Sequence, residues 1–195
     1  MKIDRKEWFA IPNILGYFRI LLIPFFMYFY ITAGNMTSNG ALALPDNRRI
    51  IAASLIVLSS LTDFLDGYIA RRFNMITNLG KILDPLADKL TQGAMVVSFL
   101  TRYPSMWVLL GALIIKDGFI TSMGIVLLRR NGRNIGGAKW YGKVCTVILY
   151  VVMFSVIVFP LGPKMINILV FACTVITLIT FLLYLPEHVR LYREE

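Results

Sequence analysis

Four aspartates form two closely spaced pairs in the first half of the sequence. Asp63 and Asp66 are three residues apart, and Asp84 and Asp88 are four residues apart. On a helix, residues at either spacing lie on one face, so each pair presents two carboxylates in the same direction. Like charges brought together need a counter-charge to stay ionised. Magnesium and manganese prefer oxygen ligands, so the pattern predicts a site for two divalent cations.

Two cations held by carboxylates favour displacement at phosphorus. Such a pair of metal ions stabilises both the attacking and the leaving oxygen of an in-line transfer. Neighbouring residues suit the same chemistry, because Gly67 and Gly80 let a ligand approach the backbone and Arg71 offers a bidentate clamp for a diphosphate. The competing interpretation is a set of ordinary helix-end charges with small residues for helix packing. Four aspartates in two helical pairs favour the metal site.

The elements that carry these residues are predicted to cross a membrane. Of the 195 residues, 57% are hydrophobic and only 16% are charged, and the mean hydropathy is +0.70. A soluble domain has about 45–50% apolar residues. A single membrane domain over residues 1–195, with an all-α fold, is therefore expected. Six stretches approach the roughly 20 apolar residues that a span requires: about 12–33, 49–71, 80–100, 106–128, 141–161 and 165–185.

Two further features concern the ends of these spans. A short amphipathic helix is expected before the first span, lying on the membrane surface through Ile3, Trp8 and Phe9. The second and third spans are joined by a loop of about ten residues. They can therefore lie antiparallel and bring the four carboxylates together at one end of the membrane.

The distribution of basic residues indicates which side of the membrane the carboxylates face. The chain has 20 Lys and Arg against 11 Asp and Glu, a net charge of +9. With the boundaries above, 13 basic residues fall on the side of both termini and 4 on the opposite side. Cytoplasmic loops carry such an excess, so both termini and the carboxylates of this multi-pass protein are predicted to face the cytoplasm. Attraction to anionic membrane lipids is a second interpretation of the excess, and no nucleic-acid partner is expected.

The aspartates belong to a longer pattern. It reads Asp63-x-x-Asp66-Gly67-x-x-Ala70-Arg71, then eight residues, then Gly80-x-x-x-Asp84-x-x-x-Asp88. This pattern resembles the signature of the CDP-alcohol phosphatidyltransferases, and the stretches IPNILGYFRILLIPFF and LTDFLDGYIARRFNMITNLGKILDPLADKL are similar to bacterial phosphatidylglycerophosphate synthases. The resemblance implies six spans in the cell membrane, a homodimer, and transfer of a phosphatidyl group from CDP-diacylglycerol to an alcohol with release of CMP.

The resemblance also implies a role for each residue of the pattern. Asp63 and Asp84 bridge two metal ions, Mg²⁺ or Mn²⁺. Asp66 completes the first metal site, whereas Asp88 completes the second and is the candidate catalytic base for the acceptor hydroxyl. The residues expected to bind the CDP-lipid are Asn13, Asp66, Gly67, Arg71 and Gly80.

The fourth and fifth spans depart from the synthase pattern, in the region where the acceptor is expected to bind. Lys116-Asp117 replaces an Arg-Glu pair, Gly124 replaces a later arginine, and Cys145 replaces the second lysine of a Gly-Lys-x-Lys-Thr stretch. The candidate acceptor contacts are Lys116, Lys139 and Lys143, with Arg129, Arg130 and Arg133 as further cations whose charge also suits the cytoplasmic side.

Three functions follow from these observations. sn-Glycerol 3-phosphate, which would give phosphatidylglycerophosphate, is the expected acceptor. The alternative within the family is phosphatidylglycerol, which would give cardiolipin, because this acceptor has no terminal phosphate monoester and needs fewer cations. The alternative outside the family is an ion transporter built on intramembrane carboxylates. Against it, the aspartates lie at one end of their spans and not at the midplane.

Overall fold

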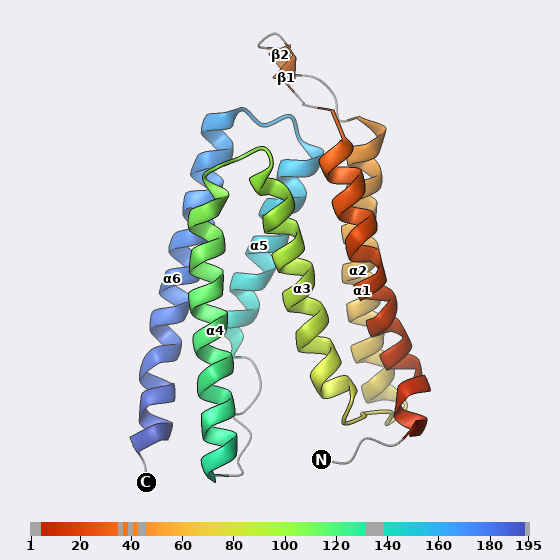
Figure 1. The fold of residues 1–195 in the computed structure, drawn as a ribbon, viewed down its shortest axis with the longest axis vertical. Coiled ribbons are helices and arrows are strands. Elements are labelled where there is room, and N and C mark those ends of the chain that lie inside the picture. Colours follow the sequence, from red (N-terminus) through yellow and green to blue (C-terminus); the bar gives the residue numbers. More distant parts are fainter. Residues whose placement is uncertain (1–4, 35–36, 39–40, 43–45, 132–138, 194–195) are drawn as a thin grey trace. The chain divides into compact units, whose positions relative to one another are not determined.

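The computed structural model describes residues 5–34, 37–38, 41–42, 46–131 and 139–193. Its long elements, labelled in Figure 1, are α1 (Ile11–Thr32), α2 (Asn47–Arg72), α3 (Gly80–Leu100), α4 (Met106–Asn131), α5 (Trp140–Val158) and α6 (Pro163–Arg193). A 3-10 helix, η1 (Arg5–Phe9), precedes α1. Two antiparallel strands of two residues each, β1 (Thr37–Ser38) and β2 (Ala41–Leu42), separate α1 from α2. The all-α prediction is confirmed, and each predicted span corresponds to one long helix.

Five of the long helices in the described part of the chain have the length and apolar composition of membrane spans. They are Ile11–Thr32, Asn47–Arg72, Met106–Gly124, Trp140–Val158 and Pro163–Pro186. The remaining helix, α3, has 21 residues and is therefore about 30 Å long, which is enough to cross the hydrocarbon core. Unlike the other five, it has no long apolar stretch with few charged residues, because its first half carries four charged residues: Lys81, Asp84, Asp88 and Lys89.

Helix α1 has apolar residues on its outward face as well as on its buried face. Its buried residues, which recur at intervals of three or four, include Asn13, Gly16, Arg19, Leu22, Phe26 and Tyr30. The outward face is not polar, as it would be in a soluble protein, but exposes Leu21, Phe25 and Tyr28. A helix with apolar residues on all sides suits a lipid environment.

The predicted N-terminal surface helix corresponds to η1. Trp8 and Phe9 at its end are 50% and 80% exposed, as expected for side chains that anchor in the membrane interface. Ile3 lies outside the described residues.

Two compact units make up the chain. The first consists of Met1–Thr101 with Phe154–Pro160, and the second of Arg102–Met153 with Leu161–Glu195. In the first unit α1 packs against both α2 and α3, and in the second α4 packs against α6. The expected direct pairing of α2 with α3 is not among the close helix pairs of the described residues. Instead α1 is packed against both, and its Arg19 contacts carboxylates of both helices. The single domain over residues 1–195 stays a prediction.

The connection between α1 and α2 is fastened by Asp46. Its carboxylate accepts hydrogen bonds from the backbone N–H of Gly34, at 3.0 Å, and of Arg48, at 3.4 Å. It therefore caps the N-terminus of α2 and holds the end of α1 beside it. These backbone hydrogen bonds, with that of Gly34 first, lower the pKa of Asp46.

Candidate active site

The carboxylate pairs lie at similar depth in the first unit. Asp63 is nine residues before the end of α2, and Asp88 is eight residues after the start of α3. At 1.5 Å per residue, both lie about 12–14 Å inside their helix ends. Asp66 and Asp84 lie one helical turn nearer those ends. The two pairs are thus brought to one end of the unit, as the sequence predicted, but one or two turns inside it.

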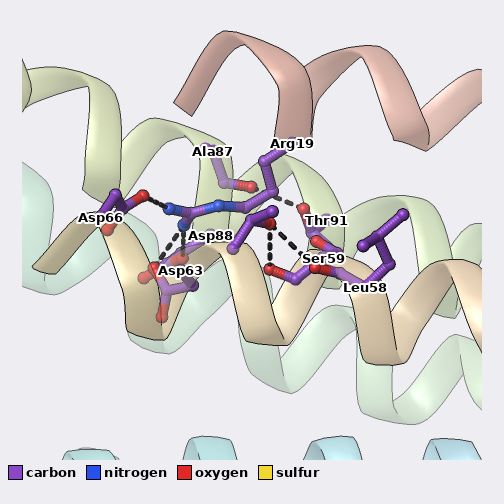
Figure 2. A network of polar contacts seen from close by, with 9 residues as sticks. Arg19, Leu58, Ser59, Asp63, Asp66, Ala87, Asp88 and Thr91 are labelled. Atoms are coloured by element: carbon purple, nitrogen blue, oxygen red, sulfur yellow. Dashed lines mark hydrogen bonds and ion pairs between the residues drawn. The ribbon is translucent and has the colours of Figure 1, made fainter. Parts of the chain in front are cut away.

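Arg19 of α1 connects three of the four aspartates (Figure 2). Its Nη1 lies 2.5 Å from Asp63 Oδ1 and 2.7 Å from Asp88 Oδ1. Its Nη2 donates to Asp66 Oδ2. The arginine side chain is 1% exposed, and that of Asp66 is 4% exposed. This pair is therefore shielded from water, and removing one partner of such a pair costs about 3–5 kcal/mol.

The position of Arg19 follows from the packing of α1. Arg19 is eight residues after the start of α1, so it reaches the same depth as Asp63 and Asp88. One turn earlier, a Cβ at Gly16 would lie 2.7 Å from Leu83 Cδ2. Because Gly16 has no side chain, α1 can approach α3 closely at this point. Arg19 then projects between α2 and α3.

The charges of the cluster do not balance. One guanidinium faces Asp63, Asp66 and Asp88, and Asp84 is one turn away from Asp88. Ionised carboxylates at all four positions would outnumber this single cation. Among the described residues, no three acidic, cysteine or histidine side chains are arranged around one point as metal ligands. The donor set nevertheless fits hard divalent cations, which take carboxylate oxygens and would offset the remaining negative charge.

Asn13 is fully buried beside the start of α3, where it connects three segments. Its amide nitrogen donates to the carbonyl of Glu7, at 2.5 Å, and its Oδ1 accepts from Thr77 Oγ1, at 3.1 Å. Glu7 in turn accepts from the backbone N–H of Leu79, at 2.9 Å. A Cβ at Gly80 would lie 2.9 Å from both Asn13 Oδ1 and Thr77 Oγ1. Gly80 therefore makes room for this hydrogen-bond network, whereas its predicted contact with the nucleotide stays a prediction.

Gly67 and Arg71 lie beside each other on the last turns of α2. A Cβ at Gly67 would be 3.4 Å from the Nη2 of Arg71, so the guanidinium folds back along the helix over the glycine. Arg71 is exposed and Gly67 partly exposed. A cation in this position, one turn beyond Asp66, is available to an anionic ligand.

Comparison with known proteins identifies the family of this fold and site. The family model of CDP-alcohol phosphatidyltransferase matches residues 9–183. The chain belongs to the CDP-alcohol phosphatidyltransferase family. The match includes all four aspartates and extends through both compact units.

Three related proteins are each described as a CDP-diacylglycerol–glycerol-3-phosphate 3-phosphatidyltransferase. The protein of Shigella flexneri serotype 5b is 33% identical over 183 residues, which cover 91% of this chain and 93% of that protein. The protein of Escherichia coli K12 is 35% identical over 142 residues, or 71% of each chain. The protein of Rickettsia bellii is 44% identical over 103 residues, which cover 52% of this chain and about half (48%) of that protein.

The lysines predicted to bind the acceptor of this phosphatidyltransferase belong to the second unit. Lys116 is 4% exposed, and its Nζ lies 3.4 Å from Asp117 Oδ1. Lys139 and Lys143, at the start of α5, are exposed. The side chains of Arg129 and Arg130, and the whole of Arg133, lie outside the described residues. The acceptor role of the three lysines therefore stays a prediction.

Gly142, which precedes Lys143 in the stretch compared above with Gly-Lys-x-Lys-Thr, has a packing role. A Cβ at this position would collide with the hydroxyl of Tyr184 on α6. The same hydroxyl accepts a hydrogen bond from the backbone N–H of Lys139, at 3.1 Å. Tyr184 thus fastens the start of α5 to α6 and fixes the backbone that carries Lys143.

Arg19, Glu7 and Thr77 were not among the predicted site residues. Arg19 is the one charged residue in the span Ile11–Thr32, and an ionisable residue inside a span indicates function. The rule that singled out the aspartates could therefore have found it. Glu7 and Thr77 act through contacts 72 and 64 residues away in sequence, and no local pattern marks them.

Proposed function

We propose that this enzyme transfers the phosphatidyl group of CDP-diacylglycerol to sn-glycerol 3-phosphate, which gives phosphatidylglycerophosphate and CMP. The observation that carries the proposal is the contact of Asp63, Asp66 and Asp88 with the single guanidinium of Arg19, in a chain with this family membership. The acceptor is supported by the shared description of relatives that align over as much as 93% of their length.

Divalent cations, Mg²⁺ or Mn²⁺, are part of the proposal. The residues that would hold two of them are Asp63, Asp66, Asp84 and Asp88. When bound, such ions neutralise the diphosphate and stabilise the attacking and leaving oxygens. Chelation should therefore abolish turnover. Added Mg²⁺ or Mn²⁺ should restore it, and Ca²⁺ should do so poorly because its bonds to oxygen are longer.

Asp88 is proposed as the base for the acceptor hydroxyl. Its side chain is 43% exposed, in contrast to the 4% of Asp66, so an acceptor can reach it. In the transfer, the acceptor oxygen forms a bond to the phosphorus that carries the diacylglycerol. The bond from that phosphorus to the oxygen of CMP breaks, and the hydroxyl proton passes to Asp88. General base catalysis of this kind contributes about 10²–10⁴-fold.

The CDP-lipid and the acceptor are assigned to different residues. Arg71, exposed beside Gly67, is proposed to bind the diphosphate through its planar fork. Asn13 and Gly80 support this side of the site through their shared hydrogen-bond network. For the acceptor we propose Lys116, Lys139 and Lys143, because a phosphate monoester carries close to two negative charges at neutral pH. The enzyme is proposed to act as a homodimer, which native mass spectrometry in detergent would detect.

The decisive experiment presents purified enzyme with CDP-diacylglycerol and one acceptor at a time. Glycerol 3-phosphate, phosphatidylglycerol and glycerol form the panel, and the lipid products are identified by mass. Phosphatidylglycerophosphate formed together with CMP is the expected result. Cardiolipin formed from phosphatidylglycerol, with glycerol 3-phosphate ignored, would replace the acceptor assignment. Absence of CMP with every acceptor would overturn the transferase assignment and leave the ion transporter.

A further inference from the structure

Arg19 occupies an unusual position for a residue outside the aspartate pattern. It is the single charge of α1, it is 1% exposed, and it contacts three carboxylates on two other helices. Arginine remains protonated in proteins, so this position carries a permanent positive charge. The side chains of Asp63 and Asp88 are 48% and 43% exposed. The cluster is therefore open on the side away from Arg19.

The oxygens that Arg19 contacts are the ligands that a divalent cation would use. They are Asp63 Oδ1, Asp66 Oδ2 and Asp88 Oδ1. A carboxylate oxygen that accepts a charge-assisted hydrogen bond from Arg19 is less available to a second cation, and the two positive charges repel. Removing the guanidinium would leave like charges facing one another without a partner. Arg19 and the metal ions thus satisfy the same electrostatic need.

We propose that Arg19 is a positioning residue that serves as the internal counter-cation of the aspartate cluster and competes with divalent cations for its carboxylates. The inference rests on the proposed function in one respect, namely that the aspartates bind such cations. In the cation-free protein Arg19 holds α2 and α3 in register. When cations bind, its hold on the carboxylates weakens, so part of the binding free energy is spent on displacing it. Arg19 consequently keeps the affinity for the cation lower than four carboxylates alone would give.

The test measures binding of Mn²⁺ alone to the full chain in detergent, without lipid substrate, from the electron paramagnetic resonance signal of free Mn²⁺. Arg19→Gln removes the charge but keeps a hydrogen-bond donor. Because a unit charge a few Å from the cation is a strong interaction even at an effective dielectric constant of about 20, we expect Arg19→Gln to bind Mn²⁺ at least about tenfold more tightly. Arg19→Lys keeps the charge and should stay within about threefold of the unsubstituted protein.

Thermal unfolding supplies a second readout and a matched control. In chelator, Arg19→Gln should lower the melting temperature by about 10 °C, as the loss of a few kcal/mol does in a domain of this size. Saturating Mn²⁺ should recover most of that loss. Arg49 is also 1% exposed and in the first unit, but its Nε donates to the carbonyl of Gly34, at 3.1 Å. It precedes Asp63 on α2 by 14 residues, which is about 21 Å along the helix. Arg49→Met should lower the melting temperature equally with and without Mn²⁺.

Each outcome separates the inference from the function on which it rests. Unchanged or weaker Mn²⁺ binding by Arg19→Gln, while the unsubstituted protein binds Mn²⁺, would overturn the counter-cation role and leave the metal site intact. If the unsubstituted protein and Asp63→Asn alike bind no Mn²⁺, the divalent-cation part of the proposed function fails. If Arg19→Gln cannot be recovered, a loss of affinity in Arg19→Lys of more than tenfold would also overturn the inference.

Discussion

At the scale of single residues, Asp88 carries the sharpest chemical prediction. Asp88→Asn keeps the size of the side chain but cannot accept the proton of the acceptor hydroxyl. We expect turnover to fall by at least about a hundredfold, the low end for loss of an acid–base group, and similar losses for Asp63→Asn and Asp84→Asn. The measurement is CMP release at saturating Mg²⁺ by protein that remains monodisperse in detergent.

Asp46→Asn is the matched control for these substitutions. Asp46 is exposed at the start of α2, where it accepts hydrogen bonds from two backbone N–H groups, and asparagine caps a helix as well as aspartate. Its turnover should be unchanged. A near-normal rate for Asp88→Asn with added metal would show that another group removes the proton.

Lys143 provides the residue-scale prediction for the acceptor. Its side chain is exposed at the start of α5, on a backbone held by Tyr184. Lys143→Ala should raise the KM for glycerol 3-phosphate by about ten- to a hundredfold, because a charge-assisted hydrogen bond is worth about 1.5–3 kcal/mol. The KM for CDP-diacylglycerol should stay within about threefold. Lys164→Ala, at the exposed start of α6, should change neither constant, and equal effects of the two substitutions would rule out a specific acceptor contact.

The aspartates could be predicted from the sequence and Arg19 was not, for a physical reason. Two carboxylates three or four positions apart define a face through local geometry alone. The three contacts of Arg19 lie between 44 and 69 residues away in sequence, so only the packing of α1 reveals them. Asn13 and Gly80 were likewise expected to bind the nucleotide. The structure shows that both are hydrogen-bonded to the hydroxyl of Thr77, and no local pattern predicts its contact with Asn13, 64 residues away in sequence.

At the scale of elements, helix boundaries were predictable wherever local signals were strong. The stretch predicted at 80–100 is α3 (Gly80–Leu100) itself, because turn residues bound it on both sides. The last predicted stretch, about 165–185, ends earlier than α6 (Pro163–Arg193), which continues beyond Pro186 into a charged segment. Hydropathy marks the apolar part of a helix and not its end. The packing of α1 against both α2 and α3 could not be predicted, because it depends on contacts such as that of Gly16 with Leu83.

The start of α3 depends on Gly80, which gives a prediction at the element scale. A Cβ at Gly80 would lie 2.9 Å from Asn13 Oδ1 and from Thr77 Oγ1. Gly80→Ala should therefore lower the free energy of unfolding by about 1–3 kcal/mol, the usual cost of overpacking. Thermal unfolding in detergent measures the effect.

Gly93 offers a control on the same helix. A Cβ at this position meets nothing within 4 Å among the described residues. Because alanine is favoured over glycine in a helix by about 1 kcal/mol, Gly93→Ala should leave stability unchanged or raise it slightly. If both substitutions destabilise equally, the contact of Gly80 with Asn13 and Thr77 is not what requires a glycine.

At the scale of the whole molecule, composition predicted the environment but not the internal organisation. The apolar excess appears as exposed aliphatic and aromatic side chains along the helices, for example Phe171 at 70% and Trp107 at 65%. A soluble protein would bury residues of this kind. The division into two compact units has no signature in hydropathy, since it arises from which helices pack together and not from how apolar each one is.

The orientation of the molecule in the membrane is the prediction at this scale. In the first unit, the start of α1, the end of α2 and the start of α3 lie at one end (Figure 1). The four aspartates belong to the parts of α2 and α3 nearest this end. The excess of Lys and Arg on that side, 13 against 4 by the predicted spans, predicts that it faces the cytoplasm, because positive loops are retained there. The soluble acceptor glycerol 3-phosphate and the product CMP would then be exchanged with the cytoplasm.

Single cysteines in two turns test this orientation in the full chain. The buried Cys145 and Cys173 are first replaced by alanine, so that only the introduced thiol reacts. Met75→Cys lies after α2 and Thr101→Cys lies after α3, and both positions are exposed. In right-side-out membrane vesicles, an impermeant maleimide should label Thr101→Cys and leave Met75→Cys unlabelled until detergent is added. Labelling of Met75→Cys alone in sealed vesicles would place the carboxylate cluster on the opposite side, and the acceptor would then have to reach the enzyme from outside the cell.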